Sequence, residues 1–131
     1  MIPNKKEKKL PKPEQIMTLQ ILSYEFLGPI PLSKWGPPMD EVLYLLLKRS
    51  KDTFEILYVG QSGKTTEADF FTKNEHFKCW IQNAGSESNL YLSIYPMWNS
   101  EPEKRERLVN KIVSKYAPIC NEKNKTDPGE S

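Results

Sequence analysis

The stretch "VLYLLLKRSKDTFEILYVG", residues 42–60, decides the fold that the sequence predicts. Its first part, 42–49, is apolar on both faces, which is typical of a strand in the middle of a sheet. The polar break "SKD" separates it from a second run, 53–60, that also has the residue types of a strand. We therefore expect the two runs to form a hairpin, and with the turn centred on Lys51 its register follows by counting.

With the turn centred on Lys51, the residue numbers of each pair add to twice 51. Tyr44 is therefore expected directly opposite Tyr58. Directly opposed residues on antiparallel strands place their Cβ atoms about 4.5–5.5 Å apart. The sequence therefore predicts two phenols side by side on one face of the sheet, just before Gly60. The other expected pairs are Leu46 with Ile56 and Lys48 with Phe54.

The segment "VGQSGKTT", 59–66, contains the Gly-Lys-Thr with which a nucleotide-binding P-loop ends. The full motif needs another glycine at residue 58, where this chain has Tyr58. A tyrosine does not let the backbone curl around a phosphate as glycine does. We therefore expect no P-loop nucleotide ligand, and instead a strand-to-helix turn shaped by Gly60 and Gly63. That turn is expected to leave Gln61 and Ser62 exposed.

The residues that follow the hairpin are predicted to form two helices and one strand. The pattern predicts a helix over 65–85, with Thr66 and Asp69 as a capping pair and Gly85 as its stop. Alternating residues predict a strand over 89–97. A last helix is expected to begin at a capping box of Ser100 and Glu103, with Pro102 in its first turn, and to end at Ala117-Pro118.

Before the hairpin, residues 24–38 contain four prolines and two glycines, which exclude a long helix. We expect an ordered Pro-rich strap whose large residues pack on the core; these are Phe26, Leu27, Leu32 and Trp35. Residues 1–14 are predicted to be a disordered basic arm and 122–131 a disordered tail, which leaves one domain over 15–121. The expected fold is α+β, with a small, three-stranded, mostly antiparallel sheet flanked by helices.

Composition limits the class of protein. The chain has 131 residues, 37% of them hydrophobic and 27% charged, as in a soluble globular domain. A net charge of +2 is too small to indicate a nucleic-acid partner by itself. The longest apolar run, Val42–Leu47, is too short to span a membrane. Cys79 and Cys120 are expected to be reduced thiols in a cytoplasmic protein.

Two short motifs of the hairpin resemble a known nuclease family. The motifs "VLY" (42–44) and "YVG" (58–60) resemble the paired motifs of the GIY-YIG nucleases, and "IVSKYAPICN" (112–121) resembles their last helix with its Pro-x-x-Asn ending. The resemblance covers about residues 40–121. It implies a three-stranded antiparallel sheet flanked by helices. It also implies hydrolysis of a DNA phosphodiester with one divalent cation, such as Mg²⁺.

The resemblance also implies roles for individual residues. Tyr58 would activate the attacking water or assist proton transfer, Tyr44 would hold that network together, and Asn121 would support the site. His76 on the following helix is a further catalytic candidate, and its plainer interpretation is a structural or surface histidine. The nucleic-acid-binding candidates are Lys64, Lys73, Gln61 and Ser62.

Three positions depart from the family pattern. Val42 replaces the glycine of the first motif, and there is no arginine between Gly60 and Trp80 to stabilise charge on the phosphate. The position of the metal-binding glutamate is occupied by Val109-Asn110. The nearest acid is Glu106, one helical turn earlier, and it is the metal-ligand candidate. Its plainer interpretation is an exposed helix residue beside Lys104, Arg105 and Arg107.

The sequence is therefore compatible with three functions. The first is a divergent GIY-YIG-like domain that binds nucleic acid, with DNA as its partner, and has lost or weak cleavage. The second is an active endonuclease in which Glu106 or Glu103 holds the metal. The third is a protein-interaction domain without enzymatic activity, whose anchors would be Trp98, Tyr91 and Tyr95.

Overall fold

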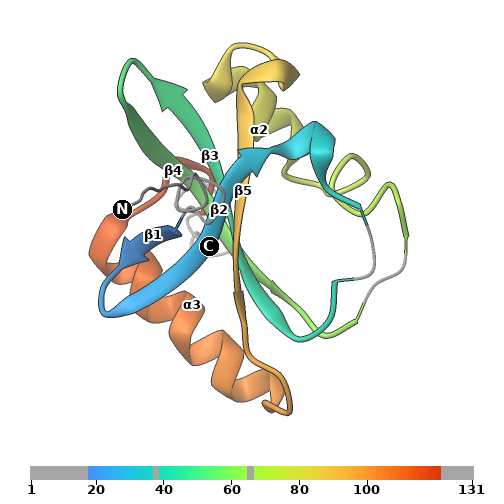
Figure 1. Ribbon diagram of the computed structural model, residues 1–131, viewed down its shortest axis with the longest axis vertical. Helices are drawn as coiled ribbons and strands as arrows, with labels where there is room; N and C mark the ends of the chain where they lie inside the picture. Colours follow the sequence, from blue (N-terminus) through green and yellow to red (C-terminus); the bar gives the residue numbers. More distant parts are fainter. Residues whose placement is uncertain (1–17, 37–38, 65–66, 122–131) are drawn as a thin grey trace, which may run out of the picture.

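A computed structural model describes residues 18–36, 39–64 and 67–121 of the chain (Figure 1). These residues form an α+β fold, in which a five-stranded antiparallel sheet is curled into a half-barrel and accompanied by two α-helices. The elements are β1 (Thr18–Ile21), β2 (Tyr24–Pro31), η1 (Leu32–Lys34), β3 (Val42–Ser50), β4 (Thr53–Ser62), α2 (Phe77–Ala84), η2 (Glu87–Asn89), β5 (Leu90–Pro96) and α3 (Pro102–Tyr116). The strand order is β1-β2-β5-β3-β4, so β4 is an edge strand.

The expected hairpin is present, but its predicted register is wrong. The turn has two residues, Lys51 and Asp52, between the pair Ser50 and Thr53. Lys51 adopts a left-handed conformation with φ of 58°, as such tight turns require. A register shift next to Leu57 then moves β4 by one further position. As a result Tyr44 faces Gly60, Leu46 faces Tyr58, Lys48 faces Glu55 and Arg49 faces Phe54.

The predicted Pro-rich strap, 24–38, contains the strand β2 and the short helix η1, and the strand β1 precedes it. β1 pairs with β2, and β2 pairs with β5, so the sheet has two strands more than expected. The prolines are accommodated because the β2–β5 register shifts between Leu27 and Ile30, and Pro31 is the last residue of its strand. Phe26 and Leu32 are buried and Trp35 is half-buried, as expected, whereas 46% of Leu27 is exposed.

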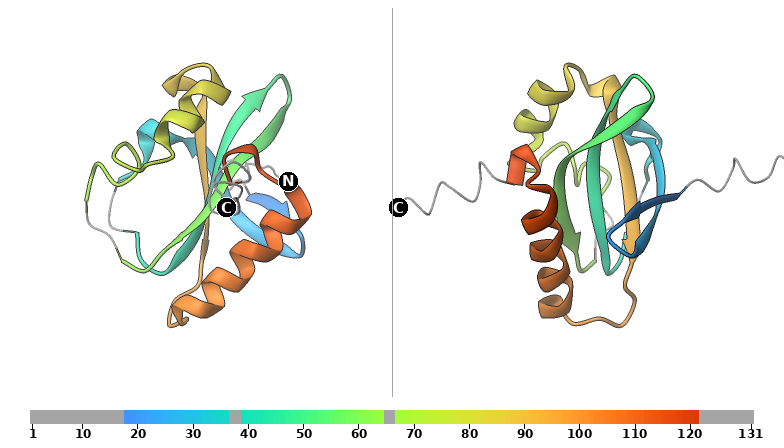
Figure 2. Two further views of the ribbon diagram at one scale, coloured as in Figure 1. Left: turned by 180° about the vertical axis from the view of Figure 1, so that it is seen from behind. Right: turned by 90° about the vertical axis from the view of Figure 1, so that its left-hand side faces the viewer.

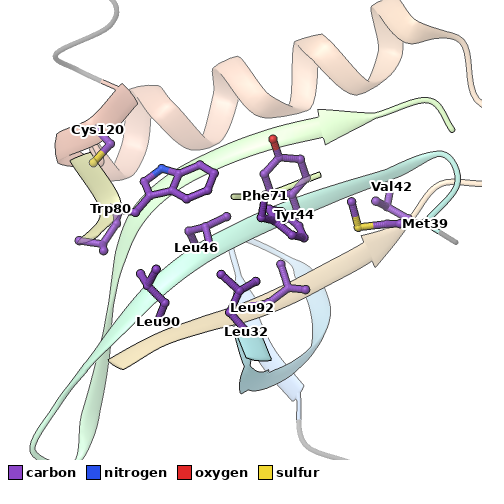
Figure 3. Close-up of a cluster of buried hydrophobic side chains, with 11 residues drawn as sticks. Leu32, Met39, Val42, Tyr44, Leu46, Phe71, Trp80, Leu90, Leu92 and Cys120 are labelled. Atoms are coloured by element: carbon purple, nitrogen blue, oxygen red, sulfur yellow. The ribbon is translucent and has the colours of Figure 1, made fainter. Parts of the chain in front are cut away.

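Residues of β3 alternate between two hydrophobic clusters, which confirms that this strand is buried on both faces. Leu43, Leu45 and Leu47 pack in the cluster that contains Leu108 and Ile112 of α3. The intervening Val42, Tyr44 and Leu46 pack in the cluster that contains Trp80 of α2 (Figure 3). The two helices therefore cover opposite faces of this part of the sheet, and Figure 1 shows them on opposite sides of β3 and β4.

The helix predicted over 65–85 is much shorter than expected. Its regular part is α2, while the residues before His76 form a series of turns. Asn74 explains part of this difference, because its side chain accepts a hydrogen bond from the backbone N–H of His76 at 2.8 Å. The predicted stop is confirmed: Gly85 has φ of 93° and donates its N–H to Ile81. Thr66 lies outside the described residues, and with it the predicted capping pair.

The last helix begins and ends close to the predicted positions, but its capping box is absent. Glu101 is the N-cap residue and makes no side-chain capping bond, and Pro102 is the first helical residue. The Ser100 hydroxyl instead accepts a hydrogen bond from Arg105 at 2.9 Å. Ala117, with φ of 45°, caps the end of α3 through its N–H to Val113, as the Ala-Pro pair predicts. Figure 2 shows α3 running along one side of the sheet.

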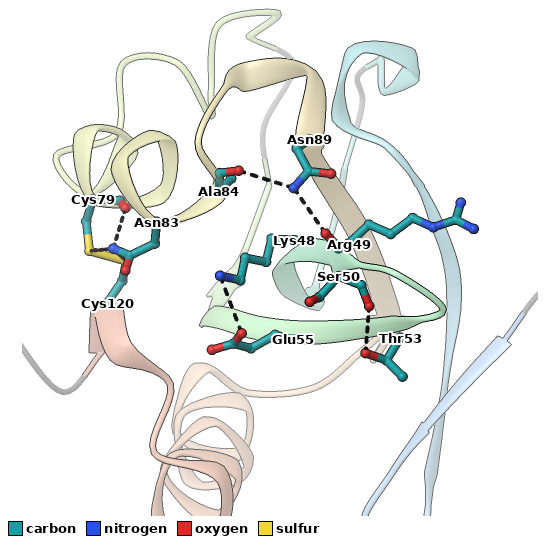
Figure 4. A network of polar contacts seen from close by, with 10 residues as sticks. All are labelled: Lys48, Arg49, Ser50, Thr53, Glu55, Cys79, Asn83, Ala84, Asn89 and Cys120. Atoms are coloured by element: carbon teal, nitrogen blue, oxygen red, sulfur yellow. Dashed lines mark hydrogen bonds and ion pairs between the residues drawn. A yellow bond between two sulfur atoms is a disulfide. The ribbon is translucent and has the colours of Figure 1, made fainter.

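Cys79 and Cys120 form a disulfide, so the prediction of two free thiols is wrong (Figure 4). The bond joins α2 to the helical residues 119–121 that follow α3. The two cysteines are 41 residues apart in the sequence, and only the folding of the chain brings them together. The sequence pattern therefore did not indicate the bond. Disulfides are rare in cytosolic proteins, so this bond does not support the cytoplasmic location, which stays a prediction.

The predicted basic arm, 1–14, and the predicted tail, 122–131, lie outside the described residues. Within the part of the chain that is described, no helix has both the length and the apolar character needed to cross a membrane.

Candidate functional site

The two tyrosines of the hairpin are in contact, although they are not directly opposed. Their ring centroids lie 6.2 Å apart with an angle of 34° between the planes. This contact is diagonal across the sheet and passes over Gly60, which faces Tyr44. A Cβ atom at Gly60 would lie 2.7 Å from Cζ and Oη of Tyr44 and 2.9 Å from Cε2 of Tyr58. Glycine is therefore needed here because the two rings occupy the space of a side chain.

A cavity of about 480 Å³ lies between the edge strand β4 and α3. Figure 3 shows the Tyr44 hydroxyl directed from β3 toward β4, the side on which this cavity lies. Most of the catalytic and supporting candidates of the sequence meet here. The lining includes Tyr44, Tyr58, Gly60, Gln61, Glu106, Asn110 and Asn121. We call it the tyrosine cavity.

Both phenols of the tyrosine cavity hold their protons more tightly than a tyrosine in water. Burial raises the pKa of Tyr44 far above the ordinary value, and the neighbouring Tyr58 adds to the rise. Burial also raises the pKa of Tyr58, with further contributions from Glu75 and Glu106. At neutral pH both side chains are therefore neutral phenols, which donate hydrogen bonds but are poor bases for activating water.

His76 lies beside Tyr58 but does not line the tyrosine cavity. Their ring centroids are 4.6 Å apart. The Nδ1 atom of His76 is 3.1 Å from Oδ1 of Asn74. Its Nε2 atom is buried and has no hydrogen-bond partner among the described residues. His76 therefore supports the ring of Tyr58 from the side of α2.

Asn121 attaches to the outer edge of β4 through both ends of its amide. Its Oδ1 accepts the N–H of Val59 at 2.7 Å, and its Nδ2 donates to the carbonyl oxygen of Val59 at 2.9 Å. The side chain thus replaces a neighbouring strand at the residue next to Tyr58. Asn121 therefore ties the segment after α3 to β4.

The sequence reasoning missed Arg105, which it placed among exposed neighbours of Glu106. Only 4% of Arg105 is exposed. Its Nε donates to Oε1 of Gln61 at 2.8 Å, and its Nη1 donates to the carbonyl oxygen of Ser100 at 2.8 Å. A pattern that could have revealed this burial was present, because Arg105 begins the buried stripe of α3. The stripe continues with Leu108, Val109 and Ile112.

The hydrogen bond from Arg105 also changes the prediction for the turn after β4. Gln61 is half-buried rather than exposed, and its side-chain oxygen is occupied by Arg105. Ser62 is only 6% exposed, so the prediction that it faces solvent is wrong. Both residues belong to β4, which extends two residues beyond the predicted strand end at Gly60.

The two candidate lysines lie outside the tyrosine cavity. Lys64 is exposed and lines a separate cavity of about 500 Å³ together with Arg105, Glu41 and Glu101. Lys73 is also exposed and forms an ion pair with Glu67. The hydrogen bond to Glu67 is the main cause that raises the pKa of Lys73. Of the two, Lys64 is therefore the one whose position allows a contact with a ligand close to α3.

The described residues contain no group of three or more His, Cys, Asp or Glu side chains placed to hold a metal ion. In the lining of the tyrosine cavity, Glu106 supplies the carboxylate, and Asn110 supplies an amide one turn along α3. Mg²⁺ often keeps several waters and binds through one or two carboxylates together with substrate phosphates. The described lining of this cavity therefore supplies one carboxylate and side-chain amides, and any metal ion there would need water or a ligand to complete its coordination.

Fold and site together define an α+β domain with a half-barrel sheet and a two-tyrosine cavity at its edge strand. Comparison of the chain with protein-family models, with curated protein sequences and with solved structures finds no match.

Proposed function

We propose that this chain is a divergent GIY-YIG-like domain that binds nucleic acid and has lost, or retains only weakly, the ability to cleave it. One observation carries the proposal. Tyr44, Tyr58, Glu106 and Asn121 come from four separate parts of the chain and line one cavity. Tyr44, Tyr58 and Asn121 occupy positions that the short motifs single out. Glu106 is the acid nearest to the position of the family's metal-binding glutamate.

Two features favour binding over cleavage. Hydrolysis of a phosphodiester needs positive charge at the place where negative charge develops. Among the described residues, the lining of the tyrosine cavity contains no lysine or arginine. The second feature is the raised pKa of both phenols, which makes the phenoxide that could activate water even scarcer than for an ordinary tyrosine. The cavity is thus equipped to donate hydrogen bonds to a phosphate oxygen and poorly equipped to activate water.

A weak metal-dependent nuclease is the second candidate, and the position of Glu106 favours it. The relocated acid lines the same cavity as the two phenols. Glu106 and the amide oxygen of Asn110 would hold Mg²⁺, which when bound would act as a Lewis acid on a phosphate oxygen. Tyr44 and Tyr58 would orient that phosphate through their hydroxyl groups.

The test uses the full-length chain with plasmid DNA in the presence of Mg²⁺ or Mn²⁺. We expect retention of DNA that falls steeply with salt, as phosphate contacts require, and little or no nicking. Lys64→Gln should weaken retention, whereas Lys51→Gln at the hairpin turn makes the same charge change away from the site and serves as the matched control.

Two results would overturn the proposal in different ways. Nicking that disappears in both Tyr58→Phe and Glu106→Gln would establish the metal-dependent nuclease instead. Absence of retention of both plasmid and single-stranded DNA, even at low salt, would exclude DNA binding and leave the protein-interaction domain.

A further inference from the structure

A second groove, of about 820 Å³, runs along the flank of α3 that faces the end of β5. Figure 1 shows the loop from β5 to α3 at the lower end of the molecule. Residues 97–100 of this loop line the groove. Trp98 lies in this loop with 71% of its surface exposed. Tyr24 and Tyr95 also line the groove, but they pack edge to face with ring centroids 5.3 Å apart. Trp98 is therefore the aromatic residue of this groove whose ring is free to stack on a ligand.

The charges of the groove have one sign. Lys104, Arg107 and Lys111 line it from α3, and their spacing of three and four residues places them on one face of the helix. All three are exposed, and none forms an ion pair with a described residue. No aspartate or glutamate belongs to the described lining. A concave surface with this charge pattern attracts a polyanion.

We infer that this groove, which we call the tryptophan groove, binds a single strand of nucleic acid. A base would stack on Trp98, and the phosphates would contact Lys104, Arg107 and Lys111. Proteins that bind single strands combine a positive groove with aromatic platforms in this way, because every base has a face that can stack. A base paired within a duplex does not offer its face to such a ring, and an acidic peptide would use the cations but not the exposed indole.

The tryptophan groove and the tyrosine cavity lie on the two flanks of α3 and share part of their lining. Asn110 and Ser114, in the C-terminal half of α3, line both of them. Lys104 and Lys111 are seven residues apart, which is about 10 Å along a helix. A strand that follows these cations therefore reaches the helix surface at Asn110 and Ser114, which also lines the tyrosine cavity. The inference rests on the proposed function, because it specifies which kind of nucleic acid the domain binds.

The first experiment measures binding of a fluorescently labelled single-stranded oligothymidylate to the full-length chain by anisotropy. We expect Trp98→Ala to weaken binding about ten-fold, and Trp98→Phe, which keeps a ring, to weaken it less. When the oligonucleotide carries no label, its binding should quench the tryptophan fluorescence of the protein. That quenching should be lost in Trp98→Phe, because Trp80 is fully buried and Trp35 does not line the groove.

The second experiment isolates the cations. For single strands each phosphate contact contributes about −0.7 to the slope of log K against log salt. The double variant Lys104→Gln/Lys111→Gln should therefore reduce the magnitude of the slope by about 1.4. Lys34→Gln/Lys51→Gln removes two exposed charges that lie outside the groove and away from α3, and it is the matched control. All of the substituted positions carry exposed side chains, so their replacement should leave the far-UV circular dichroism unaltered.

Several outcomes would overturn the inference. Binding that responds equally to the groove variants and to the control would exclude the tryptophan groove while leaving the proposed nucleic-acid binding intact. Equal or tighter binding of a duplex of the same length would exclude single-strand specificity. Polyglutamate that binds as tightly as the oligonucleotide, and is insensitive to Trp98→Ala, would identify an acidic-polypeptide site instead. Absence of any binding at low salt would contradict both proposals.

Discussion

Gly60 is the residue on which the geometry of the tyrosine pair depends most directly. The rings of Tyr44 and Tyr58 both approach its Cα so closely that a methyl group would overlap them. The sequence assigned Gly60 to a turn, because glycine commonly occurs there. The structure places it inside β4, where its role is to leave room for two aromatic rings.

Replacement of Gly60 by alanine should therefore destabilise the protein. We expect the free energy of unfolding in urea to fall by about 1–3 kcal/mol, the usual cost of overfilling a packed site. Gly36→Ala is the matched control, because a Cβ there meets nothing within 4 Å. Equal stability of the two variants would show that the rings of Tyr44 and Tyr58 move aside without cost.

Residue-level patterns identified the tyrosines but not all of their partners. Tyr44, Tyr58 and Asn121 were recognised from short motifs, and the structure places them on one cavity. Arg105 was missed because charged residues are rarely buried, and sequence reasoning assigns them to the surface. Its burial depends on acceptors supplied by Gln61, 44 residues away, and by Ser100.

At the scale of elements, the hairpin and α3 follow from local patterns, whereas β1 and β2 do not. β2 reads as irregular because of its prolines, and its strand conformation is stabilised by pairing with β5, which lies far along the chain. The helix predicted over 65–85 is longer than α2 for a related reason. Phe70 and Phe71 pack against Tyr44, with ring centroids 5.8 Å and 5.2 Å away, and this packing does not require helical backbone.

The Cys79–Cys120 disulfide should contribute measurably to stability, because it joins α2 to the segment that carries Asn121. We expect Cys79→Ser/Cys120→Ser to lower the free energy of unfolding by about 2–4 kcal/mol, since the bond closes a long loop and restricts the unfolded chain. Urea denaturation monitored by circular dichroism measures this loss.

A reducing agent provides the control for this disulfide variant. It should lower the stability of the unmodified protein by a similar amount and leave the double variant unchanged. If the reductant has no effect on the unmodified protein, then Cys79 and Cys120 are not joined in solution.

At the scale of the whole molecule, β3 connects the two hydrophobic clusters. Leu45 belongs to the cluster under α3, and Leu46, the next residue, belongs to the cluster under α2. Neither helix therefore packs on an independent core. The tyrosine cavity and the tryptophan groove lie on the two flanks of α3, so both depend on the same attachment of this helix to the sheet.

This arrangement predicts that the domain unfolds in a single cooperative transition. Leu45→Ala and Leu46→Ala should each lower the free energy of unfolding by about 2–5 kcal/mol, because both residues are fully buried. The fluorescence of buried Trp80 and the far-UV circular dichroism should change together in each variant. Separate transitions after Leu45→Ala would show that the two clusters unfold independently.

By itself the sequence determined the antiparallel hairpin, the strand and helix that follow it, the helix ends at Gly85 and Ala117, and the presence of two tyrosines on neighbouring strands. These features depend on residues close together in the chain, where periodicity and turn chemistry operate. The tertiary structure alone decided the shifted register, the pairing of β2 with β5, the disulfide and the burial of Arg105. Each of these depends on contacts between distant segments, whose energies local patterns do not contain.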